Sequence, residues 1–316
     1  MTETTKIIFE KHQIRKTKKQ KTAFIEYVQA LAAKNGYPCK VEKGTFGARN
    51  ILVGDCDSAK VLFTAHYDTC ARLPFPNFIT PKHFLFYLLY QVAAVLLFVF
   101  LPTVAVAALI YLGGWVLGID HATTVQIALF LCDIVLFGCL ILLLAGPANK
   151  HTANDNTSGV TVLTDLINQL PYDESAKVAF VFFDLEEAGL FGSLGYRSKH
   201  RRGTNRQLVV NFDCVSDGEQ MLFCVKRKAK AYAPLIETAF TATDTVKPEI
   251  ATRGVFYPSD QSNFPCGVGV AAMRKSKIGG ILYLSRIHTK RDIVYREENI
   301  AYLTRGAINL IRTLSK

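Results

Sequence analysis

The sequence lacks the cysteine spacing of a zinc finger or of a disulfide-rich domain. Its eight cysteines include no C-x-x-C pair, and two of them, Cys132 and Cys139, lie within a long apolar block. This pattern is typical of reduced thiols in a protein that faces the cytosol. We therefore expect neither a cysteine zinc site nor a disulfide framework.

A secretory signal is also missing. Residues 1–21 are polar and rich in lysine and arginine, and they contain no apolar core of the kind that a signal peptide needs. The net charge is +11, but no nucleic-acid-binding motif accompanies it, and the basic residues are dispersed except at Lys11–Lys21. An anionic membrane surface explains the charge better, because each basic residue near one gains on the order of 1 kcal/mol. We expect no nucleic-acid partner and interpret residues 1–21 as a basic extension.

Charged residues are absent from Phe84 to Ile119, and Asp133 is the only one from Ala122 to Gly146. Each stretch is long enough for a membrane span, which needs about 20 apolar residues in an α-helix. Aromatic residues lie near plausible interface levels, as membrane proteins favour. The first stretch fits either one long tilted helix or two crossings with a break at Pro102.

The number of crossings must be even if the segments before and after the block build one site, as argued below. We therefore predict a transmembrane hairpin of two helices within residues 84–145, in contact with membrane lipid. Lys82 and Lys150 then lie on the cytosolic side, as the positive-inside rule favours. The alternative is a hairpin buried inside a soluble protein. For Asp133, a hydrogen bond to Tyr or Thr across the hairpin is favoured over a functional role.

Outside the apolar block, four predicted strands each lead to side chains that can bind a metal. In open α/β sheets, sites form beyond the carboxyl ends of the strands, so these side chains are expected to meet. The strands and the residues after them are Val61–Ala65 with His66 and Asp68, Lys177–Phe183 with Asp184, Glu186 and Glu187, Leu208–Phe212 with Asp213, and Gly280–Leu284 with His288.

A fifth carboxylate, Asp155, precedes a predicted helix, whose free N–H groups are expected to hold it. Histidine and carboxylate ligands without cysteine suit zinc, and less selectively manganese or cobalt. Five such ligands exceed the needs of one ion that keeps a water, but they fit two ions about 3.5–4 Å apart with a bridging carboxylate. One of the adjacent glutamates then holds a metal, and its neighbour can take a proton from water.

Several segments resemble the co-catalytic di-zinc aminopeptidase family, the group containing bacterial leucyl aminopeptidases, glutamate carboxypeptidase and glutaminyl cyclases. The resemblance implies an α/β fold with a mixed, mostly parallel central sheet flanked by helices, here with an inserted transmembrane hairpin. It also implies a catalytic domain formed by residues 1–82 and 148–316 around an insert at 83–147. The matching segments are AHYD at 65–68, ANDNTSG at 153–159, FFDLEEAGLFGS at 182–193, NFD at 211–213, SDQSNF at 259–264 and IHTKRD at 287–292.

Position by position, the resemblance implies a role for each site residue. His66 and Asp213 bind one zinc ion, His288 and Glu187 bind the other, and Asp155 bridges the two. Among the catalytic residues, Glu186 resembles the general base, and Asp68 orients His66 from behind. The sequence departs from the family at Gln261, where a histidine is common, which puts substrate specificity in doubt. Asp184 is assigned no catalytic role. Ser158 is interpreted as a residue that belongs to the start of a helix rather than as a nucleophile.

The function predicted from these residues is that of a membrane-anchored, metal-dependent exopeptidase, and an aminopeptidase first of all. Its substrate is then a peptide, and its catalytic domain lies on the cytosolic side of the cell membrane. One alternative is a cyclotransferase like the glutaminyl cyclases, which typically work with one zinc. Another is a catalytically idle membrane scaffold on the peptidase fold. Carboxypeptidase and amidohydrolase action also stay open.

Overall fold

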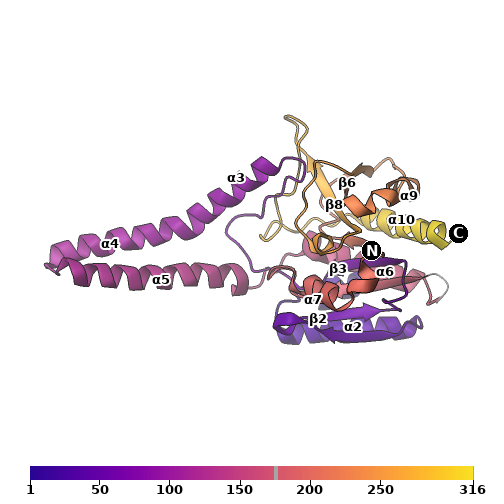
Figure 1. The fold of residues 1–316 in the computed structure, drawn as a ribbon, viewed down its shortest axis with the longest axis horizontal. Helices are drawn as coiled ribbons and strands as arrows, with labels where there is room; N and C mark the ends of the chain where they lie inside the picture. Colours follow the sequence, from indigo (N-terminus) through magenta and orange to yellow (C-terminus); the bar gives the residue numbers. More distant parts are fainter. Residues whose placement is uncertain (174–176, 316) are drawn as a thin grey trace.

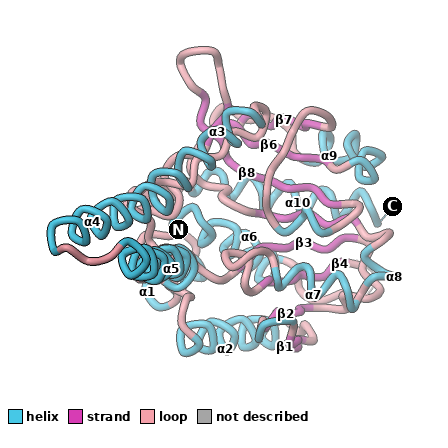
Figure 2. Tube along the Cα trace, turned by 60° about the vertical axis from the view of Figure 1, so that its left-hand side comes forward, coloured by secondary structure: helices cyan, strands magenta, loops and turns pink. Residues whose placement is uncertain are grey.

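The computed structural model describes residues 1–173 and 177–315, which form one nine-stranded sheet with helices on both faces (Figure 1 and Figure 2). The strand order is β1-β2-β4-β3-β5-β8-β6-β7, and β9 pairs with β8. The strands are β1 Cys39–Lys43, β2 Arg49–Val53, β3 Val61–His66, β4 Val178–Phe183, β5 Leu208–Phe212, β6 Gln220–Val225, β7 Lys247–Ala251, β8 Gly267–Lys275 and β9 Leu282–Tyr283. The helices are α1 Glu3–Lys11, α2 Lys18–Lys34, α3 Phe84–Val95, α4 Leu101–Leu117, α5 His121–Ala145, α6 Gly159–Gln169, α7 Phe191–Lys199, α8 Arg201–Thr204, α9 Ala233–Ala239 and α10 Glu297–Ser315.

The centre of the sheet is parallel and its edges are mixed. β4, β3, β5 and β8 run parallel to one another, whereas β2 is antiparallel to β4 and β6 is antiparallel to β8. Every residue of β3, β4 and β5 is buried, as strands covered on both faces must be. The predicted fold class and these three predicted strands are confirmed, so their carboxyl ends meet at one edge.

The fourth predicted strand, Gly280–Leu284, is wrong as a member of this parallel set. Only Leu282–Tyr283 is strand, and it pairs antiparallel with the end of β8. Gly279 and Gly280 have φ angles of 72° and 63°, so they form the turn that leads back to β8. His288 consequently reaches the sheet edge from a loop, and the strand beside β5 is β8.

Alternate residues of the central strands pack on different helical layers, because successive side chains of a strand point to opposite faces. Phe63, Phe180 and Phe212 belong to the larger core, which includes residues of α1, α2, α6 and α10. Leu62, Val181 and Val209 belong to a smaller core beneath Tyr196 of α7. The carboxyl ends of the central strands are therefore held in place by packing on both faces of the sheet.

The apolar block forms a two-helix hairpin that projects from the domain (Figure 1). α3, the π-helical turn η2 Leu96–Phe100 and α4 make one long helix, and α5 packs against α4. The π turn directly precedes Pro102, whose missing N–H removes one regular helical bond, so the helix adjusts there without breaking. Both helices are long and apolar enough to cross a membrane, and only 6% of the most apolar window of each is buried. The alternative of a hairpin buried inside the domain does not fit.

Asp133 does not make the hydrogen bond that the sequence suggests. It lies exposed on α5, and within residues 1–173 and 177–315 it has no hydrogen-bond partner. Contact across the hairpin instead comes from close packing, since Gly114 of α4 lies directly against Thr124 of α5. The Cys132 thiol also donates to the Thr103 carbonyl across the hairpin.

Residues 1–21 are part of the folded domain, which corrects their interpretation as an extension. The Thr2 hydroxyl donates to Asp165 of α6 at 2.9 Å, and α1 packs on α6. The Arg15 side chain is fully buried and donates from Nε to the Tyr67 carbonyl, at the end of β3. Lys21 forms a buried ion pair with Asp184, at the end of β4. Two basic residues of this segment therefore compensate interior carboxylates and carbonyls rather than contacting lipid.

Candidate metal centre

The structure brings the five predicted ligands together at the carboxyl edge of the sheet. His66 Nε2 lies 3.5 Å from Asp213 Oδ1 and 3.3 Å from Asp155 Oδ1. His288 Nε2 lies 3.1 Å from Asp155 Oδ2 and 3.2 Å from Glu187 Oε2. The two oxygens of Asp155 therefore face different histidines. This is the pairing that the sequence predicts, with Asp155 between the two halves.

Three polar atoms of this cluster are buried without a hydrogen bond in the described part of the chain. They are His66 Nε2, Asp213 Oδ1 and Glu187 Oε1. Buried polar groups nearly always have partners, so three orphans at one place indicate a missing binding partner. Burial is the first cause that raises the pKa of Glu187, and nearby Asp155 adds to it. Divalent cations would satisfy the orphaned atoms and offset the crowded negative charge, so the residues fit a metal centre.

Asp155 is positioned by Asp292 and not by the helix start, which corrects the sequence interpretation. The Asp292 carboxylate accepts hydrogen bonds from Asn154 N at 2.8 Å and Asp155 N at 3.0 Å. The N–H at the start of α6, on Gly159, instead donates to Asn156 Oδ1 at 3.0 Å. Only glycine fits there, because a Cβ at Gly159 would lie 2.2 Å from the Phe212 carbonyl oxygen. The helix start is thus pressed against β5, and the Asp155 carboxylate is left free for the centre.

Asp68 lies against His66, where the sequence places it, and it also holds the two adjacent glutamates. His66 Nδ1 bonds the backbone carbonyl of Asp68 at 3.1 Å, while the Asp68 carboxylate is 3.6 Å away. That carboxylate accepts hydrogen bonds from Glu186 N at 3.1 Å and Glu187 N at 3.2 Å. Asp68 therefore holds the His66 imidazole through its backbone carbonyl and holds both glutamates through its carboxylate. It is a positioning residue for ligands on both sides of the candidate centre.

Glu186 lies in the same cavity as the metal-type ligands. The cavity has a volume of about 260 Å³, and Glu186 lines it with Asp155, Glu187, Asp213 and His288. Its carboxylate also belongs to a group with His66 and Glu187 whose ligand atoms lie within 4.8 Å of one another. Burial raises the pKa of Glu186, helped by nearby Asp213 and Glu187. A carboxylate placed there can act on whatever occupies the cavity next to the metals.

Apolar residues complete the wall of this cavity, and one of them belongs to the hairpin. Tyr87 lies in the first turn of α3, and Ile79 lies in the segment just before it; both line the cavity with Leu190 and Tyr257. Phe256 contacts the rings of both Phe84 and Tyr87. The base of the hairpin therefore forms part of the wall of the cavity that holds Glu186.

The sequence comparison decides the family. The profile of peptidase family M28 matches residues 133–310, more than half of the chain, and the matched part contains Asp155, Glu187, Asp213 and His288. The chain belongs to peptidase family M28. His66 and Asp68 precede the part that matches the M28 profile, and the fold brings them to the same centre. No curated protein matches the chain in sequence.

Solved structures of the aminopeptidase and cyclase type share this M28 fold at low identity. An aminopeptidase of Legionella pneumophila superposes with a TM-score of 0.58 at 12% identity, over 99% of this chain and 70% of the other. A glutaminyl cyclase of Porphyromonas gingivalis gives 0.57 at 15% identity, with 98% of each chain covered. A leucine aminopeptidase precursor of Bacteroides thetaiotaomicron gives 0.55 at 14% identity, over 97% and 96%. The likeness establishes the fold, and it does not separate peptidase from cyclase.

Several residues of the M28 motifs turn out to be structural. Gln261 is buried, donates to the Tyr257 carbonyl at 2.7 Å and accepts from Asn211 Nδ2 at 3.2 Å, so it locks its loop onto β5. The Ser158 hydroxyl donates to the Asn154 carbonyl and accepts from Val215 N, so it joins two loops and makes no capping hydrogen bond to α6, which corrects its interpretation as helix-start chemistry. Asp184 binds Lys21 and two backbone N–H groups, those of Arg49 and Leu185.

Sequence reasoning missed three residues near the centre. Asp292 could have been noticed in the sequence, because it ends the IHTKRD segment. Its role, however, depends on a contact between two loops that only the folded chain shows. Asp260 is fully buried with neither oxygen hydrogen-bonded in the described chain, and burial raises its pKa to about 7. Cys70 lies beside three of the predicted ligands. The prediction of no cysteine at a metal site rested on spacing alone.

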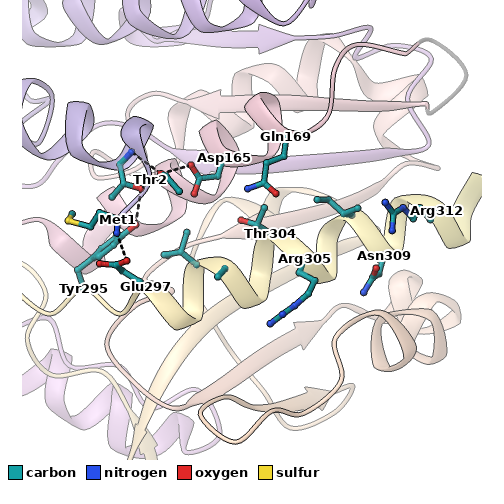
Figure 3. A pocket seen from close by; sticks show the side chains of 14 residues that line it. Met1, Thr2, Asp165, Gln169, Tyr295, Glu297, Thr304, Arg305, Asn309 and Arg312 are labelled. Atoms are coloured by element: carbon teal, nitrogen blue, oxygen red, sulfur yellow. Dashed lines mark hydrogen bonds and ion pairs between the residues drawn. The ribbon is translucent and has the colours of Figure 1, made fainter.

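A second cavity, of about 570 Å³, lies away from this chemistry (Figure 3). It opens between α6, α10 and the first residues of the chain, and it shares no lining residue with the cavity of Glu186. Figure 3 shows Asp165 joined to Thr2 and Glu297 joined to Met1, so both carboxylates of this cavity already have partners. The candidate metal ligands thus line the smaller of these two cavities.

Proposed function

We propose that this M28 protein is a membrane-anchored metallo-exopeptidase, and an aminopeptidase first of all, with its catalytic domain on the cytosolic side. The observation that carries the proposal is the position of Glu186. It shares one cavity with the predicted metal ligands, and its backbone is fixed by Asp68. A general base must lie within reach of the proton that it takes, and this cavity is where water and a peptide carbonyl would meet.

The predicted ligands suit two zinc ions, with manganese or cobalt as possible substitutes. His66 and Asp213 would hold one ion, His288 and Glu187 the other, and Asp155 would touch both. When bound, such ions activate water and polarise the scissile carbonyl as Lewis acids. Two aspartates and two glutamates line this small cavity, so the protein's own contribution is to keep them fixed while their charges are offset.

Glu186 would take a proton from the attacking water at a carboxylate oxygen and return it to the leaving amine. The Asp68 carboxylate accepts hydrogen bonds from the backbone N–H groups of Glu186 and Glu187. These bonds would keep the base and the neighbouring ligand at a fixed distance from each other. General base catalysis by a positioned side chain contributes about 10²- to 10⁴-fold to a rate. Apolar Ile79, Tyr87 and Leu190 around the cavity favour an uncharged side chain at the cleaved position.

Membrane anchoring and sidedness rest on the hairpin and on the charges at its base. The exposed faces of α3, α4 and α5 are apolar, and the turn between them lies at the far end from the domain (Figure 1). Lys82 and Lys150 flank the hairpin on the domain side, and Lys16 Nζ donates to the Leu144 carbonyl at 3.0 Å near the end of α5. Basic residues on one side of a span favour the cytosol for that side.

Glutaminyl cyclisation is the second candidate, since a glutaminyl cyclase superposes on this chain as well as the aminopeptidases do. The two reactions differ in product, so one protein sample can separate them. An aminopeptidase releases a free amino acid, whereas a cyclase converts an N-terminal glutamine into a ring and releases ammonia.

We expect the full-length protein, purified in detergent, to release p-nitroaniline from aminoacyl p-nitroanilides. Chelator should abolish this release, and added zinc should restore it, because the activity depends on the metals. The same sample is given a peptide with N-terminal glutamine and analysed by mass spectrometry. Ring formation without hydrolysis would replace the peptidase proposal by the cyclase one. No chelator-sensitive turnover of either substrate would favour the idle scaffold.

A further inference from the structure

One half of the metal centre has a cysteine beside it that the donor set of the family pattern does not use. Cys70 Sγ, a carboxylate oxygen of Asp155, a carboxylate oxygen of Glu187 and a ring nitrogen of His288 lie within 4.8 Å of one another. Zinc bonds to sulfur, nitrogen and oxygen are about 2.0–2.3 Å long, so four atoms at this spacing can surround one ion with small adjustments. The thiol is only 2% exposed, which leaves it facing the cluster rather than solvent.

The position of Cys70 is fixed by its backbone on both sides. The Cys70 carbonyl accepts from Asn149 N at 3.2 Å, and Ala71 forms a β-bridge with Ala148. On the other side, Arg15 N donates to the Thr69 hydroxyl at 3.1 Å. Residues 148–149 follow the second hairpin helix. The strand segment that carries the thiol is therefore held where the chain returns from the hairpin.

We propose that Cys70 is a fourth protein ligand of the ion held by His288 and Glu187, bound as a thiolate with its proton released to solvent. This inference rests on the metal centre of the proposed function. The ion on this side then has Cys70, Glu187, His288 and one oxygen of Asp155. The ion on the other side has three donors, from His66, Asp213 and the second oxygen of Asp155.

The unequal donor sets give the two ions different tasks. Four protein ligands close a tetrahedral zinc site, as in structural zinc sites, whereas three ligands leave a position open, as in catalytic ones. The ion beside Cys70 is thus the firmly held one, and the ion beside His66 is the exchangeable one. A thiolate also favours zinc or cadmium over manganese at its own site, because soft ligands select soft metals.

Cobalt substitution tests the ligand directly. The wild-type protein, loaded with two Co²⁺ ions per chain, should show the near-ultraviolet absorption that a thiolate–cobalt bond produces. Cys70→Ser should remove this band while circular dichroism shows the same fold. The matched control is Cys224→Ser, since Cys224 is a buried cysteine of β6 that belongs to no group of metal-type ligands. That control should keep the band.

Limited chelation gives a second readout that does not use activity. Wild-type protein should retain about one zinc ion per chain when the more exchangeable ion is removed, and Cys70→Ser should lose both together. Two bound Co²⁺ ions without the band, or a band that survives in Cys70→Ser, would overturn the cysteine assignment and leave the peptidase proposal intact. Fewer than two bound ions in the wild type would overturn the dinuclear centre and this inference with it.

Discussion

Glu186→Gln is expected to lower kcat by about 10²- to 10⁴-fold while two metal ions stay bound, because the amide keeps the shape of the side chain but cannot accept a proton. Glu186 lines the cavity, and its backbone N–H is held by Asp68, so the substitution leaves the scaffold in place. Turnover of an aminoacyl p-nitroanilide and metal content by mass spectrometry are measured on the same sample.

The metal count separates two roles for Glu186, since His66, Glu186 and Glu187 also form a group that could hold an ion. A base can be lost without loss of metal, whereas loss of a ligand lowers the metal content. Glu26→Gln is the control, because Glu26 is an exposed glutamate of α2, and it should leave both quantities unchanged. An unchanged rate in Glu186→Gln, or the loss of one ion, would refute the assignment of the base.

Asp155→Ala is expected to bring the metal content close to zero and to abolish turnover. The two oxygens of Asp155 face the two histidines, at 3.3 Å and 3.1 Å, so its removal takes a donor from each ion. Loss of a supporting residue already costs about 10- to 100-fold in metal affinity, and loss of a shared ligand should cost more on both sides. Metal content after dialysis and thermal unfolding with and without zinc are the measurements.

Two further variants define what the Asp155 result means. Asp213→Ala should lower the content by about one ion, because Asp213 contacts only the His66 side. Asp165→Ala, in α6, is the control for loss of a buried aspartate, since Asp165 bonds Thr2 and Thr4 away from the centre. It should keep two ions. If Asp155→Ala still holds two ions, the carboxylate does not bridge them.

Three of the candidate ligands were predictable because each follows a buried central strand, whereas His288 and Asp155 are placed by loop contacts. His66, Glu187 and Asp213 follow strands that are read from apolar runs, and parallel strands bring such residues to one edge. The two-helix hairpin followed from the same logic. These predictions needed only local pattern and a general rule of topology.

The supporting contacts were not predictable, because they depend on loops that meet only in the folded chain. The Asp68 and Asp292 carboxylates accept hydrogen bonds from backbone N–H groups more than a hundred residues away. Composition suggested that Lys11–Lys21 faces a membrane, yet the fold turns Arg15 and Lys21 inward. The cysteine spacing likewise gave no reason to place Cys70 near a metal site, because its neighbours there come from three other segments of the chain.

Anomalous diffraction at the zinc edge, from crystals of the zinc-loaded full chain, tests the central claim most directly. The account predicts two peaks in one cavity, one contacting His66 and Asp213 and the other contacting His288 and Glu187, with Asp155 touching both. A single peak, or zinc bound away from Asp155, would contradict a dinuclear centre assembled from segments on both sides of the hairpin.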